Sequence, residues 1–414
     1  MSSRRTPYAT CAVVGLGGLF AGVTGPLLSA FVPILVRDAL GEHRSTIGAV
    51  MAIDNVLLLL LVPWAGIFSD RASRTKRGRL PLVLLGFGLA AVGMAAFPRS
   101  AAFGIWGLIG ALVVLHSGIN LQRSPFQALL ADVVPSPYRS MANASVTFQM
   151  CIGAIAFLML GGALGMEPAF LLAAGTISAI AVGLVAGLRS AQPPVGQAAE
   201  ETFRSLVEAA SAAARGAVPG IRSMFVASFL LQVIFQSFTT WFALHGTERF
   251  GVRPEDVTVG FIAWAVGGMI GALPAGMIGV RIGRRAAMLL GFALMGLCLL
   301  ALDRVTTVAQ TTPLLMLASA SWTLPTVNAY PLFIEQIPPH RRGVLAALFL
   351  LCMAFGGAIG DPLNGAIFDL LHGYRALFLV LAAYTSLAFA AVLMIPKGAG
   401  EAQTGADAAL QSQA

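Results

Sequence analysis

The chain is built mostly of apolar runs about as long as a lipid bilayer is thick. Of its 414 residues, 57% are apolar and only 11% are charged, whereas a soluble domain carries about a quarter charged residues. A water-soluble fold of this size cannot hide so much apolar surface. Runs of about 20 apolar residues are the length of a spanning helix, so we expect an all-α membrane protein.

Twelve such runs can be placed, in two groups of six. They lie at 9–36, 46–68, 80–97, 102–131, 142–165, 169–188, 222–245, 257–280, 286–302, 312–335, 344–370 and 374–396. We expect a first six-helix bundle over 1–188, a cytoplasmic linker over 189–221, a second six-helix bundle over 222–396 and a disordered tail over 397–414. An even number of spans places both termini on one side of the membrane.

Basic residues predict which side that is. The net charge is +8, and the cations gather in short clusters between apolar runs. Loops and termini on the terminus side hold 18 Lys and Arg residues, against 7 on the other side. Positive loops stay inside, so we expect a multi-pass protein of the cytoplasmic (inner) membrane with both termini cytoplasmic. This clustering and the lack of a nucleic-acid motif exclude a nucleic-acid partner.

The polar stretch between the two groups has a helical pattern of its own. Phe203, Leu206, Val207 and Ala210 follow i, i+3, i+4, i+7 spacing. This spacing predicts a short amphipathic helix on the inner membrane surface. A solvated linker is the alternative.

Two loop signatures occur twice. Asp70-Arg71 after the second run matches Val280-Arg281 after the eighth, an offset of 210 residues. The stretch 132–139 after the fourth run matches 335–343 after the tenth, an offset of 203. An even offset of six spans makes the halves parallel repeats, related by an axis along the membrane normal. Such halves can rock about a central site, as alternating access requires.

The first loop also carries a family resemblance. It contains Gly66, Asp70, Arg71, Arg77, Gly78 and Arg79. In this spacing it resembles the signature loop of the major facilitator superfamily, which implies twelve helices in two pseudo-symmetric six-helix bundles. More narrowly, the stretches 51–55, 69–81, 128–132, 139–143 and 328–331 resemble the sucrose-carrier and glycoside–pentoside–hexuronide branch. That branch implies a sugar substrate carried with a proton or sodium ion.

The chain departs from that branch at several places. His116 stands where sucrose carriers tend to have an acid, and Gln127 where they tend to have Arg. A basic residue appears one turn earlier, at Arg123, and Val280 replaces the acid of the second loop. These differences leave the coupling ion and sucrose itself open.

Ionisable groups inside the bilayer are costly and mark functional candidates. The candidates for proton coupling are Asp54, His116, Arg123 and Asp361. His116, Asn120, Arg123 and Gln127 share one face of the fourth span, and such a polar stripe must face a cavity or another helix. Interhelical hydrogen bonding is the alternative role for this stripe. For Asp54 the alternative is a structural acid that closes the outer gate against the eleventh span.

Polar and aromatic side chains within the spans suggest the solute site. Amides both donate and accept hydrogen bonds, which suits hydroxyl-rich ligands, and aromatic faces pack against sugar rings. The substrate-binding candidates are Asn55, Asn120, Gln127, Gln232, Gln236, Thr240, Trp322, Asn328, Tyr330 and Asn364. Ordinary helix packing is the alternative for the aromatic members.

Charged residues of the repeated loops are candidates for a gate. They are Asp70, Arg71, Asp132, Arg139, Glu335 and Arg342. We expect Arg71 and Arg139 to pair with Asp132, and Arg342 to pair with Glu335. Breaking these pairs would open the cytoplasmic side.

Together these features favour a monomeric secondary transporter that imports a small polar solute, of the sugar or glycoside class, with a proton. An exporter of amphipathic compounds or drugs on the same fold is the alternative. Nucleophile, metalloprotease and phosphate-loop motifs are absent, so we expect neither an enzyme nor an ATP-driven pump. The four cysteines form no C-x-x-C pair, so we expect no metal and no cofactor beyond a coupling proton or sodium ion. The solute and the direction of flux stay open.

Overall fold

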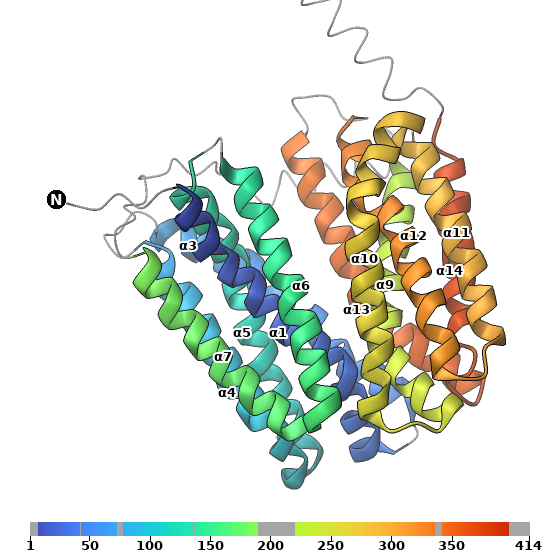
Figure 1. Ribbon diagram of the computed structural model, residues 1–414, viewed down its shortest axis with the longest axis horizontal. Coiled ribbons are helices and arrows are strands. Elements are labelled where there is room, and N and C mark those ends of the chain that lie inside the picture. The colour runs from blue at the N-terminus through green and yellow to red at the C-terminus, as the bar shows by residue number, and fades with distance from the viewer. Residues whose placement is uncertain are drawn as a thin grey trace, which may run out of the picture. The chain divides into compact units, whose positions relative to one another are not determined.

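The computed structural model describes residues 7–41, 43–72, 78–135, 138–188, 220–335 and 342–396. Within these ranges the chain is a series of long helices joined by short turns, shown in Figure 1. Most of the expected linker, including the amphipathic helix predicted around Phe203, and the expected tail over 397–414 lie outside the described residues.

The first half contains six spans. They are α1 (Pro7–Leu40), α2 (Arg44–Met51) with α3 (Ile53–Ala72), α4 (Leu80–Ser100), α5 (Gly104–Val133), α6 (Arg139–Leu164) and α7 (Met166–Leu188). The second span is interrupted only at Ala52, whose N–H still donates to the carbonyl of Gly48 at 3.0 Å. A short 3-10 turn, Ala101–Phe103, joins α4 to α5.

The second half contains six more spans. They are α9 (Ile221–Phe250), α10 (Pro254–Ile282), α11 (Arg284–Arg304), α12 (Val308–Glu335), α13 (Arg342–Leu370) and α14 (Leu377–Leu393). By length and composition, 9 described stretches can cross a bilayer, one of them covering both α4 and α5, and α14 is a shorter apolar helix. The all-α, twelve-span fold predicted from the sequence is confirmed in the described part of the chain.

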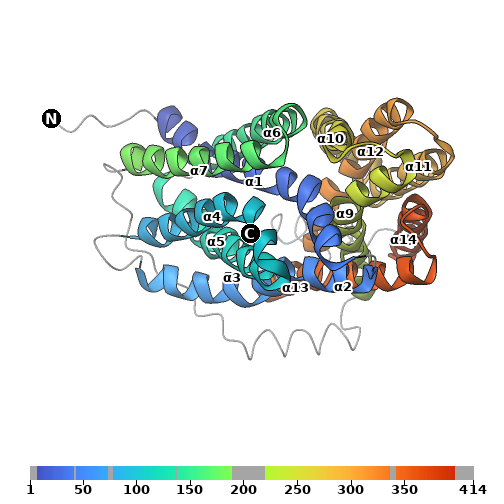
Figure 2. The same ribbon diagram turned by 90° about the horizontal axis from the view of Figure 1, so that it is seen from below.

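Small residues set the packing inside each half. A Cβ at Gly18 or Gly22 of α1 would overlap backbone atoms of α6, and one at Gly118 of α5 would overlap the backbone of α4. Gly267 on α10 is pressed in the same way against the backbone of α12. Such close approach is how membrane helices gain packing energy. Figure 2 shows α5 between α3 and α4.

The chain forms two compact units whose borders differ from the two halves. One unit comprises Met1–Ala198 together with Thr239–Ile262 and Asp361–His372, and the other comprises the remaining residues. Segments of α9, α10 and α13 therefore cluster with the first six spans. The cause is close contact, because a Cβ at Gly365 of α13 would press on the backbone of Arg44 and Ser45 in α2.

Candidate functional site

Within the first half, a close polar contact joins α3 to α5. Asp54 stands in the first turn of α3. Its Oδ1 lies 2.8 Å from Nδ1 of His116 and accepts a hydrogen bond of 2.9 Å from Nδ2 of Asn120. The His116 side chain is 11% exposed and the Asp54 side chain 34%. His116 and Asn120 are one helical turn apart on α5, so a single face of that helix holds the carboxylate.

Two buried polar atoms, one on Asn120 and one on Asn55, the residue after Asp54, have no hydrogen-bond partner among the described residues. They are Nδ2 of Asn55 and Oδ1 of Asn120. Both side chains are buried, at 3% and 0% exposure. An unsatisfied buried donor or acceptor costs about 1–3 kcal/mol. An unpartnered buried donor and an unpartnered buried acceptor are therefore suited to a polar ligand.

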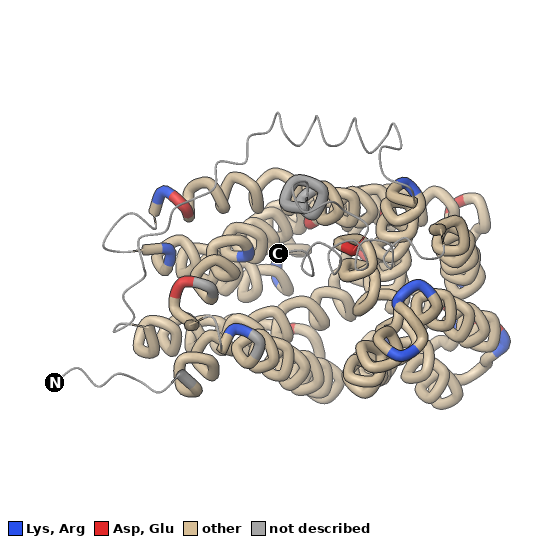
Figure 3. The backbone as a smooth tube through the Cα atoms, turned by 90° about the horizontal axis from the view of Figure 1, so that it is seen from above, with Lys and Arg blue, Asp and Glu red and all other residues tan. Residues whose placement is uncertain are grey.

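The remaining members of the α5 stripe are accessible. Arg123 and Gln127 follow Asn120 at intervals of about one turn and are exposed. Asp361 and Asn364 lie on α13 and are fully buried, with the backbone of Asp361 beside Gly48. The structure thus brings Asp54, His116 and Asn120 into one contact. Figure 3 shows how sparse acidic and basic positions are among the described helices.

The second-half candidates play different parts. Gln232, Gln236 and Thr240 occupy successive turns of α9, with Thr240 buried. Trp322 stacks on Phe235, with ring centroids 6.4 Å apart and planes at 12°.

Two other second-half candidates pack against neighbouring helices. Nδ2 of Asn328 donates to the carbonyls of Ala275 and Leu324 at 3.1 and 2.9 Å. Both of its N–H groups are used, so Asn328 joins α10 to α12 and lacks the free donor expected from the sequence. The ring of Tyr330 meets the ring of Phe349 edge-on, at 5.5 Å between centroids.

The first loop forms a partly buried charge cluster around Arg79. Its Nη1 donates to Oδ1 of Asp70 at 2.6 Å and to Oγ of Ser69 at 2.8 Å, and its Nε donates to Oδ2 of Asp132 at 2.8 Å. Partial burial lowers the pKa of Arg79, but its bonds to the two carboxylates outweigh this and hold the pKa above its ordinary value. The cluster ties the end of α3 to the start of α4 and the end of α5.

The second half repeats part of this cluster. Nη1 of Arg284 lies 3.0 Å from Oε1 of Glu335. Arg284 follows Arg79 by 205 residues, and Glu335 follows Asp132 by 203. The sequence had shown Arg79 only as part of the signature loop, and neither arginine was predicted to pair with an acid, although their shared place in the repeat was a usable signal.

The arginines expected in the gate are placed elsewhere or are outside the described part. Arg71 lies over the ring of Phe68, 6.0 Å from its centroid, and Arg139 begins α6 with an exposed side chain. The side chain of Arg342 lies outside the described residues. The partners found for Asp132 and Glu335 are Arg79 and Arg284.

A second contact joins the start of α2 to the end of α13. The carboxylate of Asp369 on α13 accepts the backbone N–H groups of Arg44 and Ser45 at 3.0 and 2.9 Å. A carboxylate there is favoured because it satisfies free N–H groups and faces the positive end of the helix dipole. A Cβ at Gly48 would overlap the carbonyl of Asp361. Asp369 and Gly48 therefore fasten α2 to α13, and sequence reasoning had named neither.

Comparison with known proteins decides the family. The family model of the Major Facilitator Superfamily matches residues 14–302 and 247–412. The chain belongs to the Major Facilitator Superfamily. It is therefore a multi-pass membrane transporter and not an enzyme. Among the described residues no group of His, Cys, Asp and Glu is arranged to hold a metal ion.

Individual relatives are distant. The chain is 25% identical over 383 residues to the tetracycline resistance protein, class E, of Escherichia coli, covering 89% of this chain and 90% of that protein. The structure of the nucleoside transporter NupG matches with a TM-score of 0.73 and 14% identity, covering 94% of this chain and 99% of that one. A bacterial homologue of the iron transporter ferroportin matches with a TM-score of 0.72 and 15% identity, over 94% and 99% of the two chains. These matches do not confirm the sucrose-carrier branch.

Proposed function

We propose that this superfamily member is a proton-coupled secondary transporter of a small polar solute, of the sugar or glycoside class. The observation that carries the proposal is the contact of Asp54 with His116 and Asn120. Placing a carboxylate and an imidazole inside a membrane-spanning bundle costs free energy, and such residues usually serve a function. Acidic and histidine side chains within membrane spans are the groups that form proton relays in transporters.

The geometry supplies a proton-binding step. With Asp54 ionised and His116 protonated, opposite charges attract across 2.8 Å in a medium of low dielectric constant. A further proton on Asp54 removes the negative charge. The carboxyl group then loses its hold on the imidazolium and on the amide of Asn120. Protonation therefore loosens α3 from α5.

The same step links the proton to the solute. Oδ1 of Asn120 and Nδ2 of Asn55 have no partner among the described residues. A hydroxyl group both donates and accepts, so solute hydroxyls can bond to either kind of atom. Since Asn120 also holds Asp54, solute binding and protonation act on the same amide.

Contacts at the two ends of the α2–α3 span are suited to alternating access, because each can open or close one end. The Arg79 cluster closes one end of the α2–α3 span, and the Asp369 contact closes the other. The distance along the helices between Arg44 and Asp70 is about 40 Å at 1.5 Å per residue. The basic residues assign the Arg79 end to the cytoplasm. On this account the protein works as a monomer in the cytoplasmic membrane with both termini inside.

Flux measurements on purified protein in liposomes test the proposal. A thermal-shift screen of sugars and glycosides first identifies a stabilising solute. We expect an inward proton gradient to drive its accumulation, and solute addition to carry protons with it. Accumulation driven by a sodium gradient at equal pH would overturn proton coupling. Failure of every polar solute to bind or move would overturn the substrate class.

One observation favours a second candidate, which is export of an amphipathic compound. The tetracycline resistance protein matches 89% of this chain. In inside-out membrane vesicles, an exporter would accumulate such a compound when protons are pumped inward. The importer proposed here would instead lose its solute from those vesicles.

A further inference from the structure

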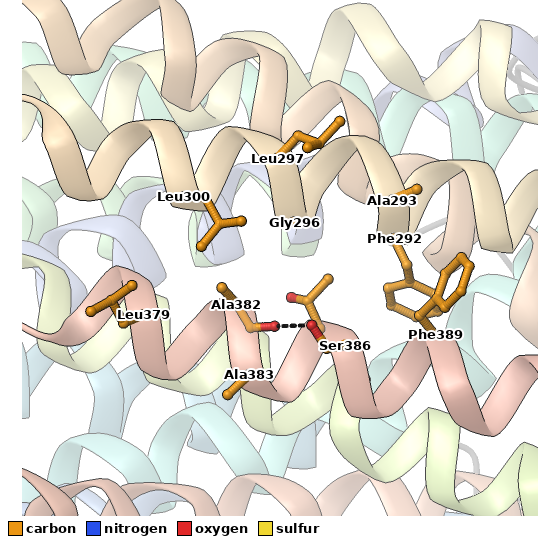
Figure 4. A pocket seen from close by; sticks show the side chains of 11 residues that line it. Phe292, Ala293, Gly296, Leu297, Leu300, Leu379, Ala382, Ala383, Ser386 and Phe389 are labelled. Atoms are coloured by element: carbon orange, nitrogen blue, oxygen red, sulfur yellow. Dashed lines mark hydrogen bonds between the residues drawn. The ribbon is translucent and has the colours of Figure 1, made fainter.

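A groove of about 450 Å³ lies between α11 and α14, away from the residues discussed so far. Figure 4 shows the two helices with the groove between them. Small residues on both walls leave room where longer side chains would fill the space, namely Ala293, Gly296, Ala382 and Ala383. Leu297 and Leu300 line it with 65% and 50% of their surface exposed. The groove is thus open along a lipid-facing surface.

The polar groups in the groove are already used. The hydroxyl of Thr385 donates to the carbonyl of Leu381 at 2.8 Å. The hydroxyl of Ser386 donates to the carbonyl of Ala382 at 2.8 Å, as the dashed line in Figure 4 marks. Each hydroxyl therefore bonds its own helix, and the walls offer an apolar surface. The part of a ligand that lies between these walls must be hydrocarbon.

A cation stands at one end of the two helices. Arg285 is in the first turn of α11, and its Nη2 donates to the carbonyl of Leu393 at the end of α14, at 2.8 Å. Its buried Nε has no hydrogen-bond partner among the described residues. The neighbouring Arg284 is paired with Glu335. Arg285 therefore places a half-buried positive charge at this end of the two helices.

The distance between this cation and the groove suits one amphipathic molecule. Phe292, at the near end of the groove, follows Arg285 by seven residues, which is about 10 Å along the helix. Arginine binds phosphate oxygens well because its N–H donors form a fixed fork. A charged head at Arg285 can therefore continue into an apolar chain that enters the groove. The distance from Arg285 to the groove matches the distance from the headgroup to the acyl chain of a lipid in one leaflet.

We propose that the α11–α14 groove is a specific site for an anionic glycerophospholipid. One acyl chain lies between Gly296 and Ala383, and the phosphate contacts Arg285. A net negative headgroup is preferred because no ammonium group competes with the guanidinium. The bound lipid comes from the leaflet on the side where α11 begins.

Binding of defined lipids to the purified full-length chain tests the site. The delipidated protein is offered phosphatidylglycerol or phosphatidylcholine, and retained lipid is counted by native mass spectrometry. Gly296→Leu fills the groove, since a Cβ there meets only Cγ2 of Thr385, at 3.9 Å. Ala383→Leu does so from α14. Gly175→Leu on α7 is the matched control, because a Cβ there meets nothing within 4 Å.

We expect one phosphatidylglycerol to be retained by the wild type and by Gly175→Leu, with at least roughly tenfold preference over phosphatidylcholine. Both groove-filling variants should lose it while remaining folded by circular dichroism. Arg285→Gln should keep an acyl contact but lose the headgroup preference. Equal retention of both lipids by the wild type, or undiminished phosphatidylglycerol on both groove-filling variants, would overturn the site.

Discussion

The two halves carry different chemistry at matching positions. On α5 the polar stripe consists of His116, Asn120, Arg123 and Gln127. An offset of 203 residues leads to Ser319, Thr323, Thr326 and Tyr330 on α12. The first stripe is titratable and holds Asp54 on a neighbouring helix.

The threonine hydroxyls of the second stripe bond to backbone carbonyls of their own helix, α12. Thr323 donates to the carbonyl of Ala320 at 2.6 Å, and Thr326 donates to that of Trp322 at 2.9 Å. The counterpart of Asp54 in the repeat is Trp264, which stacks on Phe238. One scaffold thus supports a contact between titratable side chains in one half and uncharged surface in the other. On the proposed function, proton coupling therefore belongs to the first half.

The two loop clusters differ in the same direction. Arg79 is 10% exposed and bonds two acids, whereas Arg284 is 33% exposed and pairs with Glu335, which is 41% exposed. Val280 stands where the first half has Asp70. Removing one partner of a buried ion pair costs more folding stability than removing one partner of an exposed pair. The first loop should therefore hold its end of the bundle more firmly.

The largest contrast between the halves should come from Asp54→Asn. This change removes the titrating carboxyl group and keeps its shape and hydrogen-bonding capacity. We expect uptake driven by a proton gradient to fall to the level of empty liposomes, while solute exchange at equal pH continues.

Ser319→Ala, at the second-half counterpart of His116, is the control and should leave both activities intact. Gradient-driven uptake by Asp54→Asn would remove Asp54 from the coupling step.

A next contrast concerns the end of the molecule where α2 meets α13. Gly48→Leu cannot keep that contact, because even a Cβ would overlap the carbonyl of Asp361. A cysteine placed at Ser45 should then react with a membrane-impermeant thiol reagent several-fold faster.

Gly110→Leu serves as control, since a Cβ at Gly110 meets nothing within 4 Å. Unchanged labelling in Gly48→Leu would show that Gly48 does not govern closure at this end.

A smaller contrast compares the two loop arginines. Arg79→Gln leaves Asp70 and Asp132 without their cation and should cost about 3 kcal/mol of stability. Arg284→Gln should cost about 1 kcal/mol or less. Unfolding in detergent, followed by circular dichroism at rising denaturant, measures both. Equal losses of stability would mean that the two clusters contribute equally to the stability of the fold.

The smallest effect should come from supplying the missing acid. Val280→Asp restores the pattern of the first loop on an exposed position. We expect a gain of about 0.5 kcal/mol that disappears in an Arg284→Gln background. A gain that is independent of Arg284 would show that the new acid acts in another way.

The sequence was sufficient for features that depend on composition and period. Long apolar runs predicted the spans, and the 203-residue offset predicted the repeat that now relates Asp132 to Glu335. The spacing of His116 and Asn120 placed them on one face. The spacing could not show which helix that face meets, so the contact with Asp54 appeared only in the structure.

Contacts between distant segments escaped sequence reasoning for a physical reason. Asp369 and Arg44 are 325 residues apart, and no local pattern distinguishes an acid that caps another helix from one that faces water. Asn328 had the residue type of a ligand donor, yet helix packing used both of its N–H groups. Arg79 pairs with Asp132 across 53 residues of sequence, so proximity in sequence did not indicate this partner.

The central claim is that binding of the solute changes the protonation of the Asp54–His116 pair. Weakly buffered purified protein, mixed with a binding solute across a series of pH values, reports this directly as protons taken up or released per molecule bound. The account predicts a pH-dependent proton exchange in the wild type that is lost in Asp54→Asn while the solute still binds. The same proton exchange in both proteins would contradict it.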